Sequence, residues 1–470
     1  QKLLNVDKQG KQLTMGSALR SKYGKEWLHE SDKEIKLLIK ETGTMTPRNS
    51  HEQPMSRRKD TTYYNPQVKE KLDDKGNVIR RVRGTFGGNN INYPYPTMSP
   101  TTDKVLVKIH QNSVLSDRRN KKLDYRYMCV DLKSFYLGSK LDRSEWMLVP
   151  TKYMSPELIS DLKLEKYIHK NHILFEVNGS LYGHPAAGRF SNKDLVQHLE
   201  SHGYIQSPNV PCLFSNKDKS ITFTLIVDDI GIKYINGSTE IDHLLRILQK
   251  PTSKWDIKID RTGSQYNGQR LTWNYDKNTL IADVPNYVKQ ANHELMPNQP
   301  IKRYNTPSMY EPVTYGKSQM ADKKNYKPAD AQGKKFVERV HGKYLWLSQN
   351  GDPTYQLALL HMSTELARPT TRTVEAAKRI VGYAEKHPNR GILYRASDMI
   401  LTIQSDASHH SLEGARSVAG GIFYLTDKND HPEKLNGSVD TLCKVVDQSV
   451  CASASESEYA TLYMNGQRGC

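Results

Sequence analysis

Two short apolar runs, both rich in β-branched residues, flank a pair of adjacent acids near the middle of the chain. The runs are 224–227 and 230–234, and the acids between them are Asp228 and Asp229. This pattern predicts a β-hairpin with two carboxylates at its tip. Adjacent carboxylates that are held close repel each other and lose hydration, which a divalent cation would offset. A solvated Asp-Asp turn is the competing interpretation of this segment alone.

A second strand-like run, 125–133, contains a single acid, Asp131, and leads into an aromatic-rich turn that includes Tyr136. A lone carboxylate at the end of a strand is often only the cap of a helix that follows. The run by itself therefore leaves both a functional acid and a helix cap open.

A short basic strand that ends in glycines is predicted over 78–88, after a turn at 72–77. Alternation along the strand would place Arg81 and Arg83 on one face. Two guanidiniums on one face suit a triphosphate or a nucleic-acid backbone, because each is a fork of donors that keeps its charge. A solvated edge strand that carries charge to prevent aggregation is the alternative.

Strands and helices continue through the rest of the chain. A strand turns into a helix through small residues over 173–199, and His184 in this turn has no partner His or Cys, so we interpret it as a loop residue. A second hairpin is predicted over 266–283. Apolar residues at helical spacing over 335–387 indicate core-facing stripes.

Three segments are dominated by polar residues. One amphipathic helix is predicted over 18–39, whereas 44–64 is rich in Pro, Ser, Arg and Thr and is interpreted as a mobile loop. Residues 297–333 have the composition of a linker.

The last segment, from 391, returns to strands. One of these strands contains Asp406, and a helix capped by Ser453 would contain Glu458. Asp406 and Glu458 are candidates for a second acidic site.

Composition narrows the functional classes. The 470 residues suggest about three domains. Lys and Arg total 68 against 51 acids, a formal net charge of +17, which favours nucleic acid as a partner and an anionic membrane surface second. No run is long enough to span a bilayer, and no signal segment is evident. The five scattered cysteines indicate a reducing compartment and give no support to structural zinc. The start at Gln1 suggests a fragment or a processed piece.

Six spaced blocks resemble the polymerase of copia-type long-terminal-repeat retrotransposons, which is a reverse transcriptase within a Pol polyprotein. The resemblance covers about 80–460, and the blocks stand in the family's order, which argues against chance. Residues 130–137 resemble the family's D-V-K-T-A-F-L segment, 180–183 its S-L-Y-G, and 227–229 the end of its Y-V-D-D. Residues 376–383 with 391–394 resemble its A-A-K-R-x-L-R-Y and G-L-x-Y segments. Residues 405–408 and 456–459 resemble the two segments of its ribonuclease H.

This resemblance implies an α+β right-hand polymerase with fingers, palm and thumb, followed by a partial ribonuclease H-like α/β domain. The chain stops at Cys470, before the remaining ribonuclease H acids, which puts that activity in doubt. The implied units are an N-terminal polar segment with the start of the fingers at 1–64, and the fingers and palm with the active site at 65–255. They are followed by the primer grip, linker and helical thumb or connection at 256–390, and by the truncated ribonuclease H-like domain at 391–470.

The activity implied by the resemblance is RNA-directed DNA polymerisation. Nucleotidyl transfer uses two Mg²⁺ ions, or Mn²⁺ in their place, about 3.5–4 Å apart. Asp131 and Asp228 would bridge both metals, and Asp229 would assist on the primer side. The partners would be an RNA template, a DNA or RNA primer, the RNA/DNA hybrid and deoxynucleoside triphosphates, without a membrane. The location would be intracellular, either in the nucleus or in the cytoplasm, virus-like particles included.

The resemblance also assigns the residues around the acids. Arg81 and Arg83 would grip the triphosphate, where their charge also stabilises the transition state. Tyr136 falls at the aromatic position that excludes a ribose hydroxyl, and Tyr182 and Gly183 would line the nucleotide and template pocket.

A second set lies farther along the chain. Tyr266, Asn267 and Gly268 resemble the family's primer-grip F-L-G, and Asp406 and Glu458 correspond to ribonuclease H acids.

Two departures from the family pattern bear on the site. Ile226 replaces the usual aromatic before the paired acids, and 185–189 replaces the family's K-Q-A-P-R segment. The alternatives are a domesticated, non-catalytic nucleic-acid-binding protein and a polymerase with a DNA-templated or terminal-transferase habit. Retention of all three polymerase acids argues against the first alternative.

Overall fold

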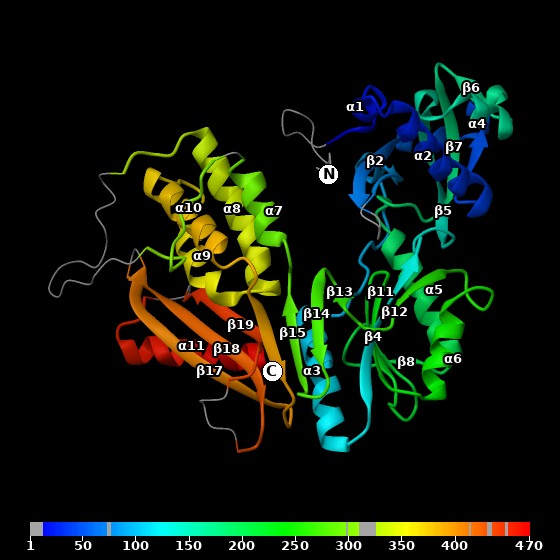
Figure 1. Ribbon diagram of the computed structural model, residues 1–470. Coiled ribbons are helices and arrows are strands. Elements are labelled where there is room, and N and C mark those ends of the chain that lie inside the picture. Colours follow the sequence, from blue (N-terminus) through cyan, green and yellow to red (C-terminus); the bar gives the residue numbers. More distant parts are fainter. Residues whose placement is uncertain are drawn as a thin grey trace.

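The computed structural model describes residues 13–72, 77–297, 299–309, 326–412, 415–429, 435–446 and 450–470. These residues form a mixed α and β structure in which sheets are arranged along the chain and covered by helices (Figure 1). Most of the turn predicted at 72–77 and the middle of the linker predicted at 297–333 lie outside the described residues.

The N-terminal sheet carries the basic strand at its edge. Its order is β1-β7-β5-β2-β3, with β6 also paired to β7, and all of its pairs are antiparallel except β2 with β5. The strands are β1 (Met45–Arg48), β2 (Thr62–Leu72), β3 (Val78–Phe86), β5 (Lys140–Pro150), β6 (Ile168–His169) and β7 (His172–Gly179).

Short helices cover this sheet. The helix predicted over 18–39 is divided into α1 (Met15–Leu19) and α2 (Gly24–Lys36), because residues 20–23 form a turn, and α2 continues as a π-helical turn (Leu37–Glu41). Trp27, Ile35 and Leu38 are buried, as their apolar spacing predicts. The small helix α4 (Pro156–Asp161) contributes Leu158 to the same core.

The central sheet has the order β12-β4-β11-β10-β9-β8 and holds the predicted acids. Helices pack on its two faces: Met128 and Val130 of β4 share a core with α5 and α6, whereas Tyr127 shares a core with Val114 of α3. The elements are α3 (Lys104–Lys121), β4 (Tyr125–Lys133), α5 (Ala187–Ser201), β8 (Ile205–Gln206), β9 (Leu213–Ser215), β10 (Thr222–Ile226), β11 (Asp229–Ile235), α6 (Thr239–Leu248) and β12 (Asp256–Asp260).

A third sheet, β13-β14-β15-β16, joins the central sheet to a helical bundle. The helical stripes predicted over 335–387 form the core of that bundle, where Val340, Tyr344 and Ile380 are buried. The elements are β13 (Gln265–Tyr266), β14 (Gln269–Asn274), β15 (Thr279–Asp283), α7 (Tyr287–Leu295), α8 (Ala331–Asn350), α9 (Gln356–Ser363), α10 (Thr371–Lys386) and β16 (Gly391–Arg395).

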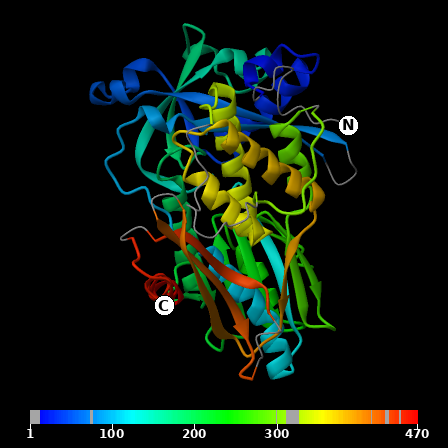
Figure 2. The same ribbon diagram turned by 90° about the vertical axis from the view of Figure 1, so that its left-hand side faces the viewer.

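The C-terminal sheet, β17-β18-β19, is antiparallel and is packed against α11. Ser453 caps α11 by accepting a hydrogen bond from the Glu456 backbone N–H at 3.1 Å, as predicted. Figure 2 shows this sheet and the N-terminal sheet toward opposite ends of the molecule. The elements are β17 (Ile400–Leu412), β18 (Arg416–Thr426), β19 (Ser438–Val445) and α11 (Ala454–Gly469).

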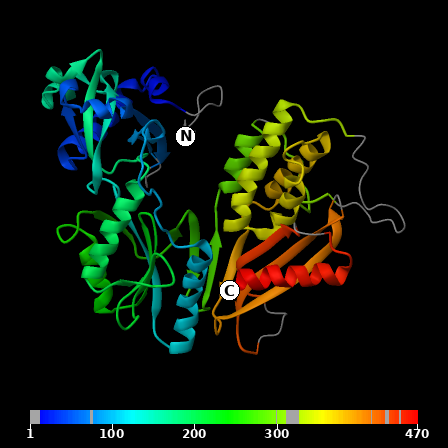
Figure 3. The same cartoon turned by 180° about the vertical axis from the view of Figure 1, so that it is seen from behind.

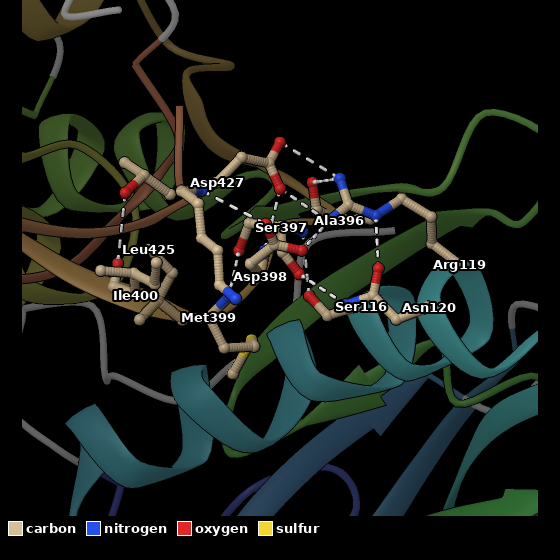
Figure 4. A network of polar contacts seen from close by, with 12 residues as sticks. Ser116, Arg119, Asn120, Ala396, Ser397, Asp398, Met399, Ile400, Leu425 and Asp427 are labelled. Carbon is tan, nitrogen blue, oxygen red and sulfur yellow. Dashed lines mark hydrogen bonds and ion pairs between the residues drawn. The ribbon is translucent and has the colours of Figure 1, made fainter. Parts of the chain in front are cut away.

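Helix α3 connects the central and C-terminal sheets (Figure 3). Val114 and Leu115 of α3 share one buried cluster with Phe423 and Leu442 of the C-terminal sheet. Polar contacts at the C-terminal end of α3 reinforce this packing (Figure 4). The guanidinium of Arg119 donates to Asp398 and Asp427 at 2.9 and 2.6 Å.

Two sequence expectations are corrected by long-range pairing. The segment 44–64, expected to be a mobile loop, contains β1, which pairs with β7, and Arg57, which binds the fully buried Glu145 at 2.5 Å. The strand at 392–394, placed with the C-terminal domain beginning at 391, pairs instead with β15. Local composition shows polarity or strand character but not the partner, so neither contact was predictable from pattern.

None of the helices in the described ranges is both long and apolar enough to span a membrane.

Candidate active site

The paired acids lie at the tip of the predicted hairpin. Strands β10 and β11 pair in register from Thr222 with Lys233 to Ile226 with Asp229, which leaves Val227 and Asp228 as the two-residue turn. Val227 has a φ of +58°, a left-handed conformation that costs a β-branched residue about 1–3 kcal/mol. Strain of this kind is concentrated at functional sites, and here it fixes how the two acids leave the strands.

Asp131 is brought directly opposite this tip. In the β4–β11 pair, Asp131 is the register partner of Asp229, and the Leu132 N–H donates to the Asp228 carbonyl at 2.9 Å. Opposed residues in an antiparallel pair project from the same face of the sheet. The residues that follow Asp131 form a turn and then β5, so the helix-cap interpretation of this acid is wrong.

The carboxylates perturb one another. Burial and the charges of Asp228 and Asp131 raise the pKa of Asp229 to about 6. Burial also raises the pKa of Asp228, with a further contribution from Asp131, while Arg83 opposes this shift. Asp131 and Asp229 share one face, and Asp228 lies in the adjoining turn, so these three half-buried acids form a site in which negative charge is costly unless a cation is present.

The three carboxylates do not form a closed metal cage. In the part of the chain that the structure describes, no group of three or more His, Cys, Asp and Glu side chains is arranged to hold a metal ion. Their chemistry nevertheless suits Mg²⁺, which prefers hard oxygen ligands and is commonly held by one or two carboxylates together with substrate phosphates. The metal assignment of Asp131, Asp228 and Asp229 stays a prediction.

A cationic and aromatic wall stands beside the acids. The guanidinium of Arg83 lies 4.1 Å from the centre of the Tyr182 ring, and Tyr182 meets the Tyr136 ring edge to face at 5.2 Å. The charge of Asp228 raises the pKa of both tyrosines, after the larger effect of burial. Arg83, Tyr182, Tyr136 and Asp228 therefore belong to one continuous site.

Tight backbone contact holds this wall in place. The Phe86 N–H at the end of β3 donates to the Tyr182 carbonyl at 2.6 Å. Gly183 has a φ of +88°, and a Cβ there would lie 2.4 Å from the Phe86 carbonyl oxygen. Glycine is therefore required at 183.

The basic strand is arranged as alternation predicts, and it has neighbours that the sequence analysis missed. Val82 is buried and Arg81 is exposed, with Lys69 of β2 directly opposite Arg81. Lys71 lies near enough that Asp131 raises its pKa, although burial and the neighbouring arginines lower it overall. Glu34 of α2 interacts with both arginines and accepts from the Gly84 N–H at 2.8 Å. The alternation of Lys69, Glu70 and Lys71 in the sequence could have indicated a second basic strand face beside the arginines.

The predicted primer-grip residues occupy a tight hairpin. Asn267 and Gly268 both have positive φ values, of 48° and 77°, as an Asn-Gly turn requires. Tyr266 is only 2% exposed, and its hydroxyl lies 2.9 Å from Thr224 Oγ1 and 3.0 Å from the Thr224 carbonyl. The Tyr266 side chain anchors the hairpin to β10. The turn at Asn267 and Gly268 is therefore the part of the hairpin that can face a nucleic-acid strand.

The second pair of acids lies on two elements that pack together, but Ser405 and His409 are the β17 residues whose side chains contact α11, and alternation turns Asp406 to the other face. Glu458 of α11 accepts from the Ala407 N–H at 3.3 Å, next to Asp406 on β17. Both acids are exposed, and neither they nor their neighbours form a three-ligand group within the described ranges.

No protein-family model matches the chain, and no curated protein matches it. The fold is similar to that of the foamy viral protease-reverse transcriptase solved in complex with double-stranded DNA, with a TM-score of 0.46 and 10% identity over 94% of this chain. The matched region is 60% of the length of that viral chain. At this identity and TM-score, the similarity establishes neither the family nor the function of this chain.

Proposed function

We propose that this chain is an RNA-directed DNA polymerase of the copia retrotransposon type, with the N-terminal sheet as fingers, the central sheet as palm and the helical bundle as thumb or connection. The observation that carries the proposal is the opposition of Asp131 and Asp229 on one face of the central sheet, with Asp228 in the adjoining turn beside Arg83 and its tyrosine wall. The motif order along the chain supports the same assignment.

The reaction joins a nucleotide to the primer. The 3′-hydroxyl oxygen of the primer bonds to the α-phosphorus of the incoming triphosphate as it loses its proton, and the bond to pyrophosphate breaks. When bound, divalent ions supply Lewis-acid stabilisation of the attacking and leaving oxygens. Asp131 and Asp228 would hold these ions, and Asp229 would assist on the primer side.

The other residues position the triphosphate. Arg83 and Arg81 offer donors that keep their charge, and Lys71 adds a third cation toward the acids. The Tyr136 ring meets that of Tyr182 and is close enough for Asp228 to raise its pKa, and we assign it to pack against the sugar of the incoming nucleotide. The selected substrate is therefore a deoxynucleoside triphosphate.

The direct test is extension of a DNA primer on an RNA template with deoxynucleotides and Mg²⁺ or Mn²⁺, with a DNA template of the same sequence in parallel. We expect extension on RNA that ceases on chelation of the metal. Extension on DNA alone would replace the RNA-templated assignment, and extension without a template would indicate a terminal transferase. No extension across a range of salt and metal concentrations would overturn the enzymatic proposal.

A further inference from the structure

A pocket lies at the opposite end of the central sheet from the acids. Its volume is about 610 Å³, and it lies between the ends of β4 and β11 and the strand β14. Arg126 in its wall is five residues before Asp131 along β4, a distance of about 17 Å for an extended strand. The pocket is thus separate from the candidate active site, and its size suits one small-molecule ligand.

The wall of this pocket carries positive and neutral groups. Arg126, Arg261 and Arg270 line it, and none of its lining residues is acidic. Within the described ranges, Arg261 makes no hydrogen bond or ion pair and is exposed. Asp260, directly before it, is turned onto its own loop, where it accepts from the Ser264 N–H at 2.6 Å.

The other two arginines are each held by a carboxylate that uses only part of the guanidinium's N–H donors. Arg126 uses Nε and Nη2 on Asp124, at 2.8 and 3.2 Å, and Arg270 uses Nε and Nη2 on Asp283, at 2.8 and 2.5 Å. The Nη1 group of each is left for a ligand. Preorganised guanidinium forks of this kind favour phosphate oxygens.

Aromatic rings form the remaining wall. Trp273 and Tyr275 are stacked with an interplanar angle of 4° and a centroid distance of 5.6 Å, and the Arg126 guanidinium lies 4.2 Å from the Tyr275 ring centre. Thr272 adds a hydroxyl group, and Thr262 and Ser264, whose hydroxyl groups donate to Asp260, add oxygen atoms that can accept. Phosphate-binding cations beside a flat aromatic wall and hydroxyl groups suit a nucleotide, whose phosphate and base need different partners.

We propose that this pocket is a second nucleotide-binding site, in which Arg261, Arg126 and Arg270 bind the phosphate and the wall at Trp273 receives the base or sugar. The nucleotide can be free or can belong to a bound strand, since both present the same phosphate and base. The site requires no chemistry at the polymerase acids.

The test is binding to the full chain in EDTA, without primer, so that failure here is distinct from failure of polymerisation. The probes are dAMP, a short oligothymidylate and inorganic phosphate, measured by isothermal titration calorimetry. Arg261→Gln removes a side chain that has no hydrogen-bond or ion-pair partner among the described residues, and Thr272→Glu places a carboxylate at an exposed position of the wall. Arg246→Gln, an exposed arginine on α6, is the matched control.

We expect Arg261→Gln to weaken nucleotide binding about tenfold and to reduce the number of ions released on binding by about one. Thr272→Glu should weaken binding further than Arg261→Gln does. Arg246→Gln should leave binding unchanged. Binding of dAMP that depends on Arg261 identifies a free nucleotide as a sufficient ligand, whereas dependence only with oligothymidylate identifies a unit of a strand. Binding of all probes that is indifferent to Arg261, or phosphate binding as tight as dAMP binding, would overturn the proposal.

Discussion

Tyr136 is the residue that the proposed function assigns to discrimination between sugars. It is half-buried, in edge contact with Tyr182, and within the electrostatic influence of Asp228. In the proposed polymerase, its ring would fill the space that a ribose hydroxyl needs. Tyr136 was predicted from the resemblance alone, and the Arg83–Tyr182 contact that supports it depends on strands that are far apart in the sequence.

Tyr136→Ala is expected to raise ribonucleotide incorporation relative to deoxynucleotide incorporation by about tenfold or more, because the excluded volume is lost. Single-nucleotide insertion with matched dNTP and rNTP pairs measures this ratio. Tyr136→Phe, which keeps the ring, serves as the control and should discriminate like the parent. Unchanged selectivity in the alanine variant would remove Tyr136 from this role.

The ionisation of Asp229 makes the stability of the folded protein depend on pH. The pKa of Asp229 in the folded state is about 6, above the ordinary value of 3.8. The folded state therefore loses free energy of unfolding as the pH rises from 3.8 to about 6, and the whole loss is present at higher pH. Asp229→Asn should therefore raise the free energy of unfolding of the metal-free protein at about pH 8 by about 1–2 kcal/mol, after allowance for partial exposure.

Urea unfolding in EDTA at about pH 8 and about pH 4 measures this difference. It should largely disappear at the lower pH, because the carboxyl is then protonated in the folded state and about half protonated in the unfolded state. An equal effect at both pH values would indicate a change in packing instead of relief of charge repulsion.

At the scale of elements, the apolar patterning predicts the β10–β11 hairpin, the strand of Asp131 and the basic strand β3, because each has a strong local period. Pairing between distant elements was not predictable in the same way. Nothing near Met45 indicates that β1 pairs with β7, and nothing in 391–395 indicates that β16 pairs with β15. The opposition of Asp131 and Asp229 likewise follows from strand register and not from spacing.

The hairpin of β13 and β14 provides a prediction at this scale. Tyr266→Phe removes a buried hydroxyl that contacts Thr224, and we expect it to lower the free energy of unfolding by about 1–2 kcal/mol, while extension of a preannealed primer changes little. Denaturant unfolding and steady-state extension on the same samples measure the two effects. Selective loss of extension with unchanged stability would show that Tyr266 itself contacts the primer.

At the scale of the whole molecule, α3 fastens the C-terminal sheet to the central sheet through packing and through Arg119 (Figure 4). Cysteines in each part report separately on opening, since Cys212 is buried in the central core and Cys451 is buried in the cluster shared with the C-terminal sheet. The charge patterning of the sequence did not indicate this attachment, because Arg119, Asp398 and Asp427 are far apart along the chain.

Arg119→Gln should lower the stability of this attachment by about 1 kcal/mol and so increase the thiol-labelling rate of Cys451 about fivefold, with little effect on Cys212. Lys104→Gln, exposed at the other end of α3, is the control and should change neither rate. Peptide mapping of labelled protein measures both. Equal acceleration at Cys212 and Cys451 would show that Arg119 stabilises the molecule globally and not at this junction.

A polymerase centre at Asp131, Asp228 and Asp229 would depend on the Asp228 carboxylate, and single-nucleotide insertion by Asp228→Asn on a primed RNA template measures that dependence. Asp218→Asn, at an exposed turn shortly before β10, is the matched control. We predict that Asp228→Asn lowers kcat by about 1000-fold or more without loss of stability, and that Asp218→Asn retains parental activity. Insertion by Asp228→Asn at the parental rate would contradict the assignment of the site.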